Sequence, residues 1–252
     1  MLNIVIPMAG AGSRFASEGY GEPKPLIPVH GRPMIQTVIN NLRPACDHRF
    51  IFVCRQAHID AFALREKLDA WAPGCEIASV PALTEGAACT VLAARSFINT
   101  EFPLMIANSD QYVDVSIDDY LNVMARQKYD GLIMTMRASD PKWSFVALDA
   151  NQLVTQVAEK QVISNEATVG IYNFKRGADF VEQAEAMIAT NERVNGEFYV
   201  APVYNRLIAA AKQIGIFNIG SEGAGMYGLG IPSDLQRFLA SEVSLNMRGQ
   251  AV

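Results

Sequence analysis

The sequence predicts an α/β fold, with a mostly parallel central sheet flanked by helices and added strands in the second half. Short apolar runs with little polar alternation recur along the first half of the chain, as is typical of strands covered on both faces. Segments with apolar residues at helical spacing lie between these runs. Strands that alternate with helices imply right-handed crossovers, and therefore neighbouring strands that run parallel.

Five apolar runs in the first half are the predicted strands. They cover residues 3–7, 50–54, 76–80, 103–107 and 131–136. Helices are expected between them over residues 33–42, 57–71, 85–98 and 116–127. The first of these helices has its apolar side chains on one face behind a proline in the first turn, at Met34, Ile35, Val38, Ile39 and Leu42.

The pattern changes after Ser139. Strands with turn residues between them are expected over 144–149, 154–159 and 167–174, and helices near 176–190 and 198–213. These elements are expected to elaborate the same sheet. No internal repeat, low-complexity tract or linker-like shift of composition divides the chain, so one domain over residues 1–252 is expected.

Composition limits the possible partners and location. The chain has 252 residues, 50% of them hydrophobic, and can bury a substantial core. A net charge of −5 with scattered lysines and arginines argues against a nucleic-acid partner. Neither a leader pattern nor an apolar stretch of spanning length is present, so we expect a soluble, cytoplasmic protein with no membrane partner. The four cysteines lack the spacing of a zinc site, which predicts reduced thiols.

The first strand runs into the segment GAGSRF at residues 10–15, which is the main candidate for ligand binding. A dinucleotide fingerprint would need a third glycine where Phe15 stands. Residues 16–31 are rich in glycine and proline and predict a functional loop of about sixteen residues. Gly10 and Gly12 allow backbone N–H groups to face an anion, and Arg14 and Lys24 supply positive charge for a polyphosphate. A glycine turn with two solvated basic residues is the alternative.

The run GAGSRF, followed by PKPLIPVHGRPMI, resembles the start of nucleotidylyltransferases of the sugar-1-phosphate type. The resemblance continues through TEGAACTVLAA, IANSDQYV, AEK, VGIYNF, GEFYVAPVYN and GLGIPSDL. It implies a Rossmann-like sheet of the glycosyltransferase-A type. It also implies an enzyme that uses Mg²⁺ and transfers a nucleoside monophosphate from a nucleoside triphosphate to a small phosphorylated acceptor, with release of pyrophosphate.

Within that family, three segments are similar to a branch found with capsule and surface-polysaccharide genes: DPKWSFVALD, VAEKQVISNEATVGIYNF and GEFYVAPVYN. One type in that branch joins CTP to phosphoglutamine, so the resemblance favours CTP. Two alternatives stay open. One is a sugar-1-phosphate nucleotidylyltransferase that makes a nucleoside-diphosphate sugar. The other is a glycosyltransferase-like or regulatory nucleotide-binding protein, although NSDQY lacks the second aspartate of a DxD motif.

The resemblance assigns roles to particular residues. Those implied to bind the nucleotide are Ala9, Gly10, Ala11, Gly12, Ser13, Arg14, Lys24, Glu85, Gly86, Asn108 and Ser109. Arg14 and Lys24 are also implied in catalysis, together with Lys160, which would meet the acceptor phosphate. Asp110 and Glu197 are implied metal ligands. Asp110 also follows a buried strand, at the edge where open α/β sheets bind ligands.

Each of these assignments has a structural alternative. Asp110 is compatible with a turn or helix cap, Glu197 with the first turn of a helix, and Lys160 with a solvated charge pair beside Glu159. Trp143 and Tyr172 are expected either to line the acceptor pocket or to lie in the core. The segment GLGIPSDL is expected to have only a packing role, because Ile231 stands where the family usually has threonine. The oligomeric state, a homodimer included, is left open.

Overall fold

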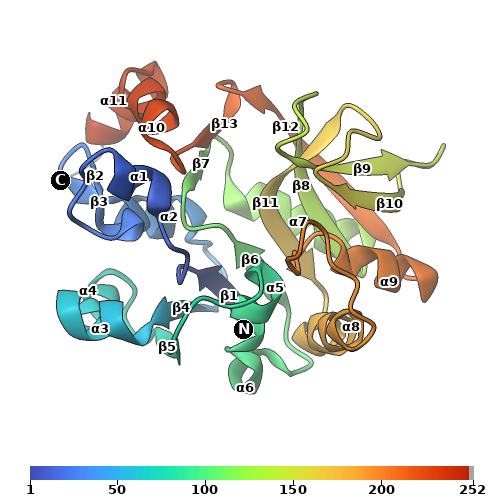
Figure 1. The fold of residues 1–252 in the computed structure, drawn as a ribbon. Coiled ribbons are helices and arrows are strands. Elements are labelled where there is room, and N and C mark those ends of the chain that lie inside the picture. Colours follow the sequence, from blue (N-terminus) through green and yellow to red (C-terminus); the bar gives the residue numbers. More distant parts are fainter. Residues whose placement is uncertain (250–252) are drawn as a thin grey trace.

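The computed structural model describes residues 1–249 (Figure 1). Its central feature is one large sheet, in which four parallel strands of the first half lie side by side in the order β5-β4-β1-β6. These strands are β1 (Leu2–Pro7), β4 (His48–Arg55), β5 (Glu76–Val80) and β6 (Leu104–Ala107). Ile4 of β1 pairs with Phe50 on one side and Met105 on the other. The parallel part of the predicted fold is therefore confirmed.

The second half of the chain extends this same sheet, as expected. β11 (Glu166–Phe174) runs antiparallel between β6 and β8 (Gly131–Arg137), and β12 (Ile214–Glu222) lies parallel to β8. β13 (Gly225–Gly228) and β7 (Gln111–Val113) complete the row. The strands β9 (Ser144–Leu148) and β10 (Val154–Glu159) form a pair beside β11. A separate ribbon joins β2 (Pro28–Val29) and β3 (Arg32–Pro33).

Helices cover both faces of the sheet. One face packs on α2 (Met34–Leu42), α3 (Gln56–Phe62), α4 (Leu64–Trp71) and α7 (Ile117–Gln127). The other face packs on α5 (Ala87–Leu92), α6 (Arg95–Ile98), α8 (Gly177–Ala189) and α9 (Val203–Ala209). Alternation along β1 explains the two layers, because Ile4 and Ile6 join the first cluster and Val5 joins the second.

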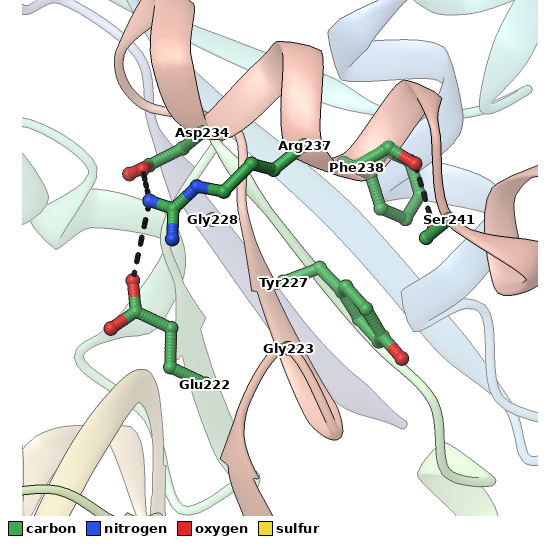
Figure 2. A pocket seen from close by; sticks show the side chains of 8 residues that line it. All are labelled: Glu222, Gly223, Tyr227, Gly228, Asp234, Arg237, Phe238 and Ser241. Atoms are coloured by element: carbon green, nitrogen blue, oxygen red, sulfur yellow. Dashed lines mark hydrogen bonds and ion pairs between the residues drawn. The ribbon is translucent and has the colours of Figure 1, made fainter.

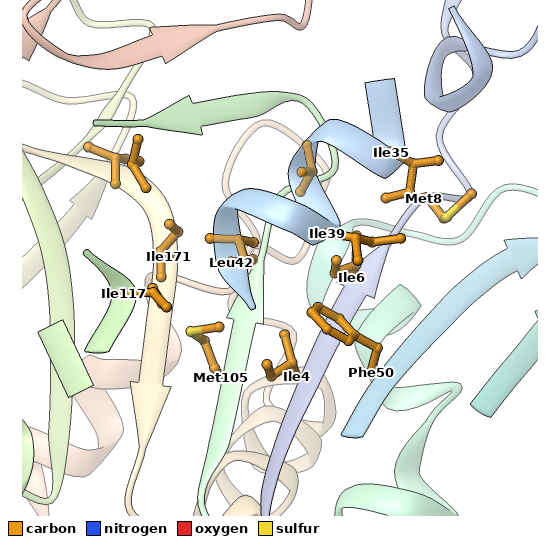
Figure 3. Packing of buried hydrophobic residues seen from close by; sticks show 14 of the residues in the cluster. Ile4, Ile6, Met8, Ile35, Ile39, Leu42, Phe50, Met105, Ile117 and Ile171 are labelled. Carbon is orange, nitrogen blue, oxygen red and sulfur yellow. The ribbon is translucent and has the colours of Figure 1, made fainter. Parts of the chain in front are cut away.

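The first apolar layer is dense, and Figure 3 shows how α2 fits into it. Ile35, Ile39 and Leu42 of α2 are almost fully buried against side chains of β1 and β6, including Ile4 and Met105. Full burial of such a side chain stabilises a fold by roughly 1.5–3 kcal/mol. The apolar stripe read from the sequence is therefore the face with which α2 covers the sheet.

A third apolar cluster ties the N-terminal loop to the end of the chain. Phe15 of α1 (Ser13–Ser17) and Ile27, next to the short 3₁₀ helix η1 (Lys24–Leu26), pack with Leu235 and Phe238 of α10 (Pro232–Leu239). α10 and α11 (Glu242–Gly249) lie beside α1 and the β2–β3 ribbon (Figure 1). The long loop is therefore held from both ends of the sequence.

Several predicted elements differ in detail. The helix expected over 57–71 is two helices, because Ala63 has a left-handed backbone with φ 49°. The helix over 85–98 is also divided, and the one over 198–213 is reduced to α9. The segment 16–31, expected as a loop, contains the last two residues of α1, all of η1 and the short strand β2. The strands β2, β3, β7, β12 and β13 and the helices α10 and α11 were not predicted from the sequence. Among the described helices, none combines the length and apolarity needed to cross a membrane.

Candidate active site

A cleft of about 420 Å³ opens where β1 and β6 end. The carboxyl ends of parallel strands in open α/β sheets are the usual place for ligands. Nine of the sequence-predicted site residues line it: Ala9, Gly10, Ala11, Lys24, Gly86, Asn108, Ser109, Asp110 and Glu197. The rest of the wall includes Leu83, Thr84, Ala87 and Thr90. The fold therefore brings together segments that are up to 188 residues apart in the sequence, from Ala9 to Glu197.

The glycine loop, residues 9–14, packs directly on the segment that carries Lys24. Gly12 has φ +62°, and a Cβ at this position would lie 3.3 Å from Lys24 Cβ. A side chain there would be strained by the backbone and crowded by Lys24. Of residues 9–14, only Ala9, Gly10 and Ala11 line the cleft. Gly12, Ser13 and the exposed Arg14 lie just beyond it, at the start of α1.

Lys24 and Asp110 form the main charged pair of the cleft. Lys24 Nζ donates to Asp110 Oδ2 at 2.6 Å, and the two side chains are only 22% and 25% exposed. The ammonium group thus lies where a cation bound to this carboxylate would stand. No cluster of three or more histidine, cysteine, aspartate or glutamate residues able to hold a metal occurs within residues 1–249. Carboxylate oxygens such as those of Asp110, together with the oxygens of a bound phosphate, are the kind of ligand that Mg²⁺ takes in proteins.

The closing segment around Gly230 positions Asp110. Leu229 N donates to the backbone oxygen of Asp110 at 2.8 Å, and a Cβ on Gly230 would lie 2.6 Å from Asp110 Oδ2. Below this segment, a small pocket of about 130 Å³ lies between β13 and α10, where Arg237 joins Asp234 and Glu222 (Figure 2). The segment GLGIPSDL therefore has a defined packing contact, in which Gly230 lies against the carboxylate of Asp110.

The start of α5 closes another side of the cleft. Gly86 has φ +133°, and a Cβ there would lie 2.4 Å from the backbone oxygen of Phe198. The backbone of Phe198 accepts a hydrogen bond from Ala88 N and donates one to the oxygen of Glu85. The Glu85 side chain is directed elsewhere: its carboxylate lies 3.2 Å from Arg193 and is 65% exposed. Of the predicted pair, only Gly86 lines the cleft.

A second cavity of about 290 Å³ adjoins the cleft, since Ala87 and Asn108 line both. Lys160 contributes to its wall, and so do Trp143 and Tyr172. Tyr172 is also 7% exposed and bonded to Thr168, so it belongs to both the core and the cavity. Several further lining residues have no role predicted from the sequence, among them Lys142, Thr168 and Tyr199. Lys142 and Tyr199 stand within the motifs DPKW and GEFYV, and these motifs could have indicated that the two residues belong to the site.

Lys160 has a defined position at this cavity. Its backbone is left-handed, with φ 53°, and its Nζ donates to Tyr199 Oη at 2.6 Å. This hydrogen bond is the main cause that raises the pKa of Lys160, so the group carries its charge at neutral pH. Burial raises the pKa of Tyr199, and Glu197, which interacts with the hydroxyl, raises it further. Glu197 therefore lies between the cleft that it lines and the Lys160–Tyr199 pair.

Glu159 is a partly buried carboxyl next to these groups. Burial raises its pKa above the usual value of 4.5, while a hydrogen bond from Ser144 and the nearby charge of Lys160 lower it. Since the folded chain binds this proton more tightly than the unfolded chain, stability falls as pH rises above about 4.5 and through the folded pKa.

We expect Glu159→Gln to remove this pH-dependent loss. Urea unfolding of both proteins between pH 4.5 and 8 measures the effect. The unfolding free energy of the variant should rise relative to that of the wild type as pH increases. Parallel stability curves for the two proteins would contradict this account of Glu159.

Gly170 packs against Asn108, which lines both cavities. It has φ +81°, and a Cβ there would lie 2.0 Å from Asn108 Nδ2. We expect Gly170→Ala to lower the free energy of unfolding by about 2–4 kcal/mol, because backbone strain and displacement of Asn108 add. Urea unfolding with Gly21→Ala as control tests this. Gly21 has no left-handed φ and no atom within 4 Å of a built Cβ, so a change within about 0.5 kcal/mol is expected there.

Comparison with known proteins supplies the family. A family model described as nucleotidyl transferase matches residues 4–200. The bifunctional protein GlmU of Methanocaldococcus jannaschii is 25% identical over 221 residues, or 85% of this chain and 49% of that protein. GlmU of Burkholderia orbicola (strain AU 1054) is 27% identical over 220 residues, or 84% of this chain and 46% of that protein. The chain thus spans about half the length of these curated relatives.

Solved structures share the fold. A nucleoside-diphosphate-sugar pyrophosphorylase from Vibrio cholerae RC9 matches with a TM-score of 0.81 and 28% identity, over 94% of this chain and all of that one. A UDP-glucose pyrophosphorylase complexed with UDP-glucose matches over 99% of both chains, with a TM-score of 0.74 and 16% identity, which shows a common fold alone. The mixed α/β fold, the cleft at the strand ends and the matched residues 4–200 lead to one conclusion. The chain belongs to the nucleotidyl transferase family of enzymes.

Proposed function

We propose that this chain transfers a nucleoside monophosphate from a nucleoside triphosphate to a small phosphorylated acceptor and releases pyrophosphate. The observation that carries the proposal is the pair of adjoining cavities. One has the glycine loop, Lys24 and Asp110, the other has Lys160, and Asn108 lies in the wall of both. Two anionic substrates bound there would meet at the shared wall. We further propose that residues 1–252 act as one domain, since a single sheet carries both cavities.

The reaction requires orientation and charge rather than a protein nucleophile. An oxygen of the acceptor phosphate attacks the α-phosphorus in line, and the bond from that phosphorus to the bridging oxygen of the β-phosphate breaks, so pyrophosphate leaves with the electron pair. In this proposal the loop amides and Lys24 bind the triphosphate, and Arg14 approaches it from α1. Lys160 orients the acceptor phosphate and offsets its charge.

Asp110 and Lys24 exchange partners when substrate binds. Their 2.6 Å pair stabilises the cleft without substrate. With the triphosphate present, Lys24 would turn to the phosphates and leave Asp110 available to a cation. Bound Mg²⁺ would neutralise phosphate charge and polarise the α-phosphate. Glu197 is the second proposed ligand. Its interaction with Tyr199 also supports a role toward the acceptor.

The nucleotide we favour is CTP, and the acceptor is phosphoglutamine, in capsule or surface-polysaccharide biosynthesis. The support is the resemblance of DPKWSFVALD and GEFYVAPVYN to that branch. The second cavity adds support, because two lysines and one partly buried carboxyl suit an acceptor with a phosphate, a carboxylate and an ammonium group. Lys142, 3.0 Å from Glu222, and Lys160 supply the cations, and Glu159 supplies the carboxyl.

The second candidate function is a sugar-1-phosphate nucleotidylyltransferase. The 28% identity to a protein named as a nucleoside-diphosphate-sugar pyrophosphorylase favours it. Pairing CTP, UTP, dTTP and GTP in turn with phosphoglutamine and with hexose 1-phosphates, with pyrophosphate release as the readout, separates the two. Pyrophosphate from CTP and phosphoglutamine alone supports the first function. Release with a sugar phosphate supports the second, and release with none of the pairs contradicts both.

Thermal unfolding tests nucleotide binding without catalysis. A ligand that binds only the folded state raises the midpoint by mass action, so CTP with Mg²⁺ is expected to raise Tm by several degrees at a concentration about a hundredfold above its Kd. NAD(H) should leave Tm unchanged. Equal shifts with NAD(H) and CTP would contradict the mononucleotide site. A larger shift with UTP or dTTP would contradict only the preference for CTP.

A further inference from the structure

A third large cavity, of about 400 Å³, lies at the end of the sheet opposite the nucleotide cleft. Leu2, the first residue of β1, and Pro103, just before β6, form one wall. Pro7, the last residue of β1, lines the nucleotide cleft. At about 3.3 Å per residue, the strand separates the two sites by roughly 17 Å. Neither proposed substrate would reach this cavity.

The wall is mostly apolar. Leu121, Met124 and Ala125 of α7, with Tyr129 just after it, line the side opposite the strands. A volume of this size and character is that of a small-molecule site. It is large enough for two fused aromatic rings with a substituent.

The wall of this cavity includes one buried polar residue, Asn173. Asn173 is 1% exposed and lines the cavity, and its Oδ1 has no hydrogen-bond partner within the described chain. Its neighbours on β6 and β8, Met105 and Leu132, are apolar. A buried carbonyl oxygen without a donor is costly, by about 1–3 kcal/mol. A ligand with an N–H or O–H group at this place would satisfy it.

The mouth of the cavity is basic. Lys128, which follows α7, and Lys175, which follows β11, are both exposed there. Lys175 Nζ lies 3.6 Å from Asp130 Oδ1. No ion pair is recorded for Lys128 among residues 1–249. Lys128 and Lys175 outnumber Asp130 on this side of the mouth, whereas Asp118 and Asp47 lie near Cys46, which also lines the cavity, so an anionic group is favoured on the lysine side.

We propose that this cavity binds a small amphipathic anion: an aromatic body between α7 and β1, an N–H or O–H donor to Asn173, and one negative charge near Lys128 and Lys175. The proposal does not depend on the proposed function, because the site shares no lining residue with the two substrate cavities.

The test uses 1-anilinonaphthalene-8-sulfonate, which combines an aromatic body, an N–H donor and a sulfonate. N-phenyl-1-naphthylamine is the matched probe, because it lacks only the sulfonate. Fluorescence titration of the full chain should give one site for the sulfonate probe, with the neutral probe about three- to tenfold weaker. Lys128→Ala with Lys175→Ala should abolish that preference, while Lys67→Ala, on α4, should retain it. Equal affinity for both probes in the wild type would overturn the anionic preference.

Two further variants test the location. Ala125 is exposed on α7, so Ala125→Phe should fold normally, fill the cavity and weaken binding of both probes at least tenfold. Asn173→Leu should weaken both about threefold or more, whereas a merely apolar groove would bind them unchanged or more tightly. Unchanged affinity in Ala125→Phe, or displacement of the probe by CTP with Mg²⁺, would overturn the proposal. So would a dimer in sedimentation that Ala125→Phe dissociates, since a second copy would then cover this face.

Discussion

Replacing Asp110 with asparagine is expected to lower Mg²⁺-dependent turnover by at least a hundredfold while the fold survives. Asparagine keeps the size of the side chain but removes the charge that would balance a divalent cation beside the phosphates. A hundredfold loss corresponds to about 2.7 kcal/mol of transition-state stabilisation. The measurement is kcat as a function of Mg²⁺ concentration, with circular dichroism as a folding control. Near-normal turnover would contradict the role of Asp110.

Asp119 offers a matched control for this variant. It lies in the first turn of α7 and lines none of the four cavities described, so Asp119→Asn should leave kcat within about twofold of wild type. A loss in both variants would indicate a general effect of charge.

The same assay decides what Glu197 does. If Glu197 and Asp110 hold one cation, Glu197→Gln should cause a similar loss, and the double variant should be little worse than the poorer single variant. Independent, multiplicative losses would instead place Glu197 on the acceptor side, where its interaction with Tyr199 lies. In that case the Mg²⁺ dependence of Glu197→Gln would match that of the wild type.

Lys160→Ala is expected to lower kcat/KM for the acceptor by ten- to a hundredfold, with nucleotide binding nearly unchanged. The reason is the position of Lys160 in the second cavity, where its ammonium is held by Tyr199 at 2.6 Å and would offset the acceptor phosphate. Each tenfold loss is about 1.4 kcal/mol. Steady-state kinetics with each substrate varied in turn gives the two effects separately.

Lys24→Ala should instead weaken nucleotide binding and leave the KM for the acceptor nearly unchanged. Since Lys24 lines the nucleotide cleft beside Asp110, its loss should raise KM for the triphosphate and reduce the Tm shift that CTP and Mg²⁺ produce. Lys67→Ala, on the exposed surface of α4, is the control for both lysine variants. Identical losses of nucleotide affinity in Lys24→Ala and Lys160→Ala would contradict separate binding places for the two substrates.

Local pattern was sufficient for the strands of the first half. The runs at 3–7, 50–54, 76–80, 103–107 and 131–136 each correspond to a strand of the structure, because a strand buried on both faces must be almost wholly apolar. The stripe of α2 could also be predicted, since burial of one helix face requires it. By contrast, β13 contains Gly225 and Gly228, which carry no strand pattern. Its pairing with β7 and β12 stabilises it as a strand, and such pairing is not visible in local sequence.

For the site, the sequence by itself predicted the candidate segments: GAGSRF, Lys24, Asp110, Lys160 and Glu197 each stand in a recognisable motif. The charged side chains suit phosphates and cations, and the glycines supply backbone freedom, and both are properties of residue type. Only the tertiary structure decided which of them meet. It placed Glu85 beside Arg193, paired Lys24 with Asp110, and joined Lys160 to Tyr199. Those outcomes depend on strand order, on left-handed turns such as that at Lys160, and on long-range packing such as Gly230 against Asp110. Contacts of this kind form between segments far apart in the chain, so no local pattern of residues encodes them.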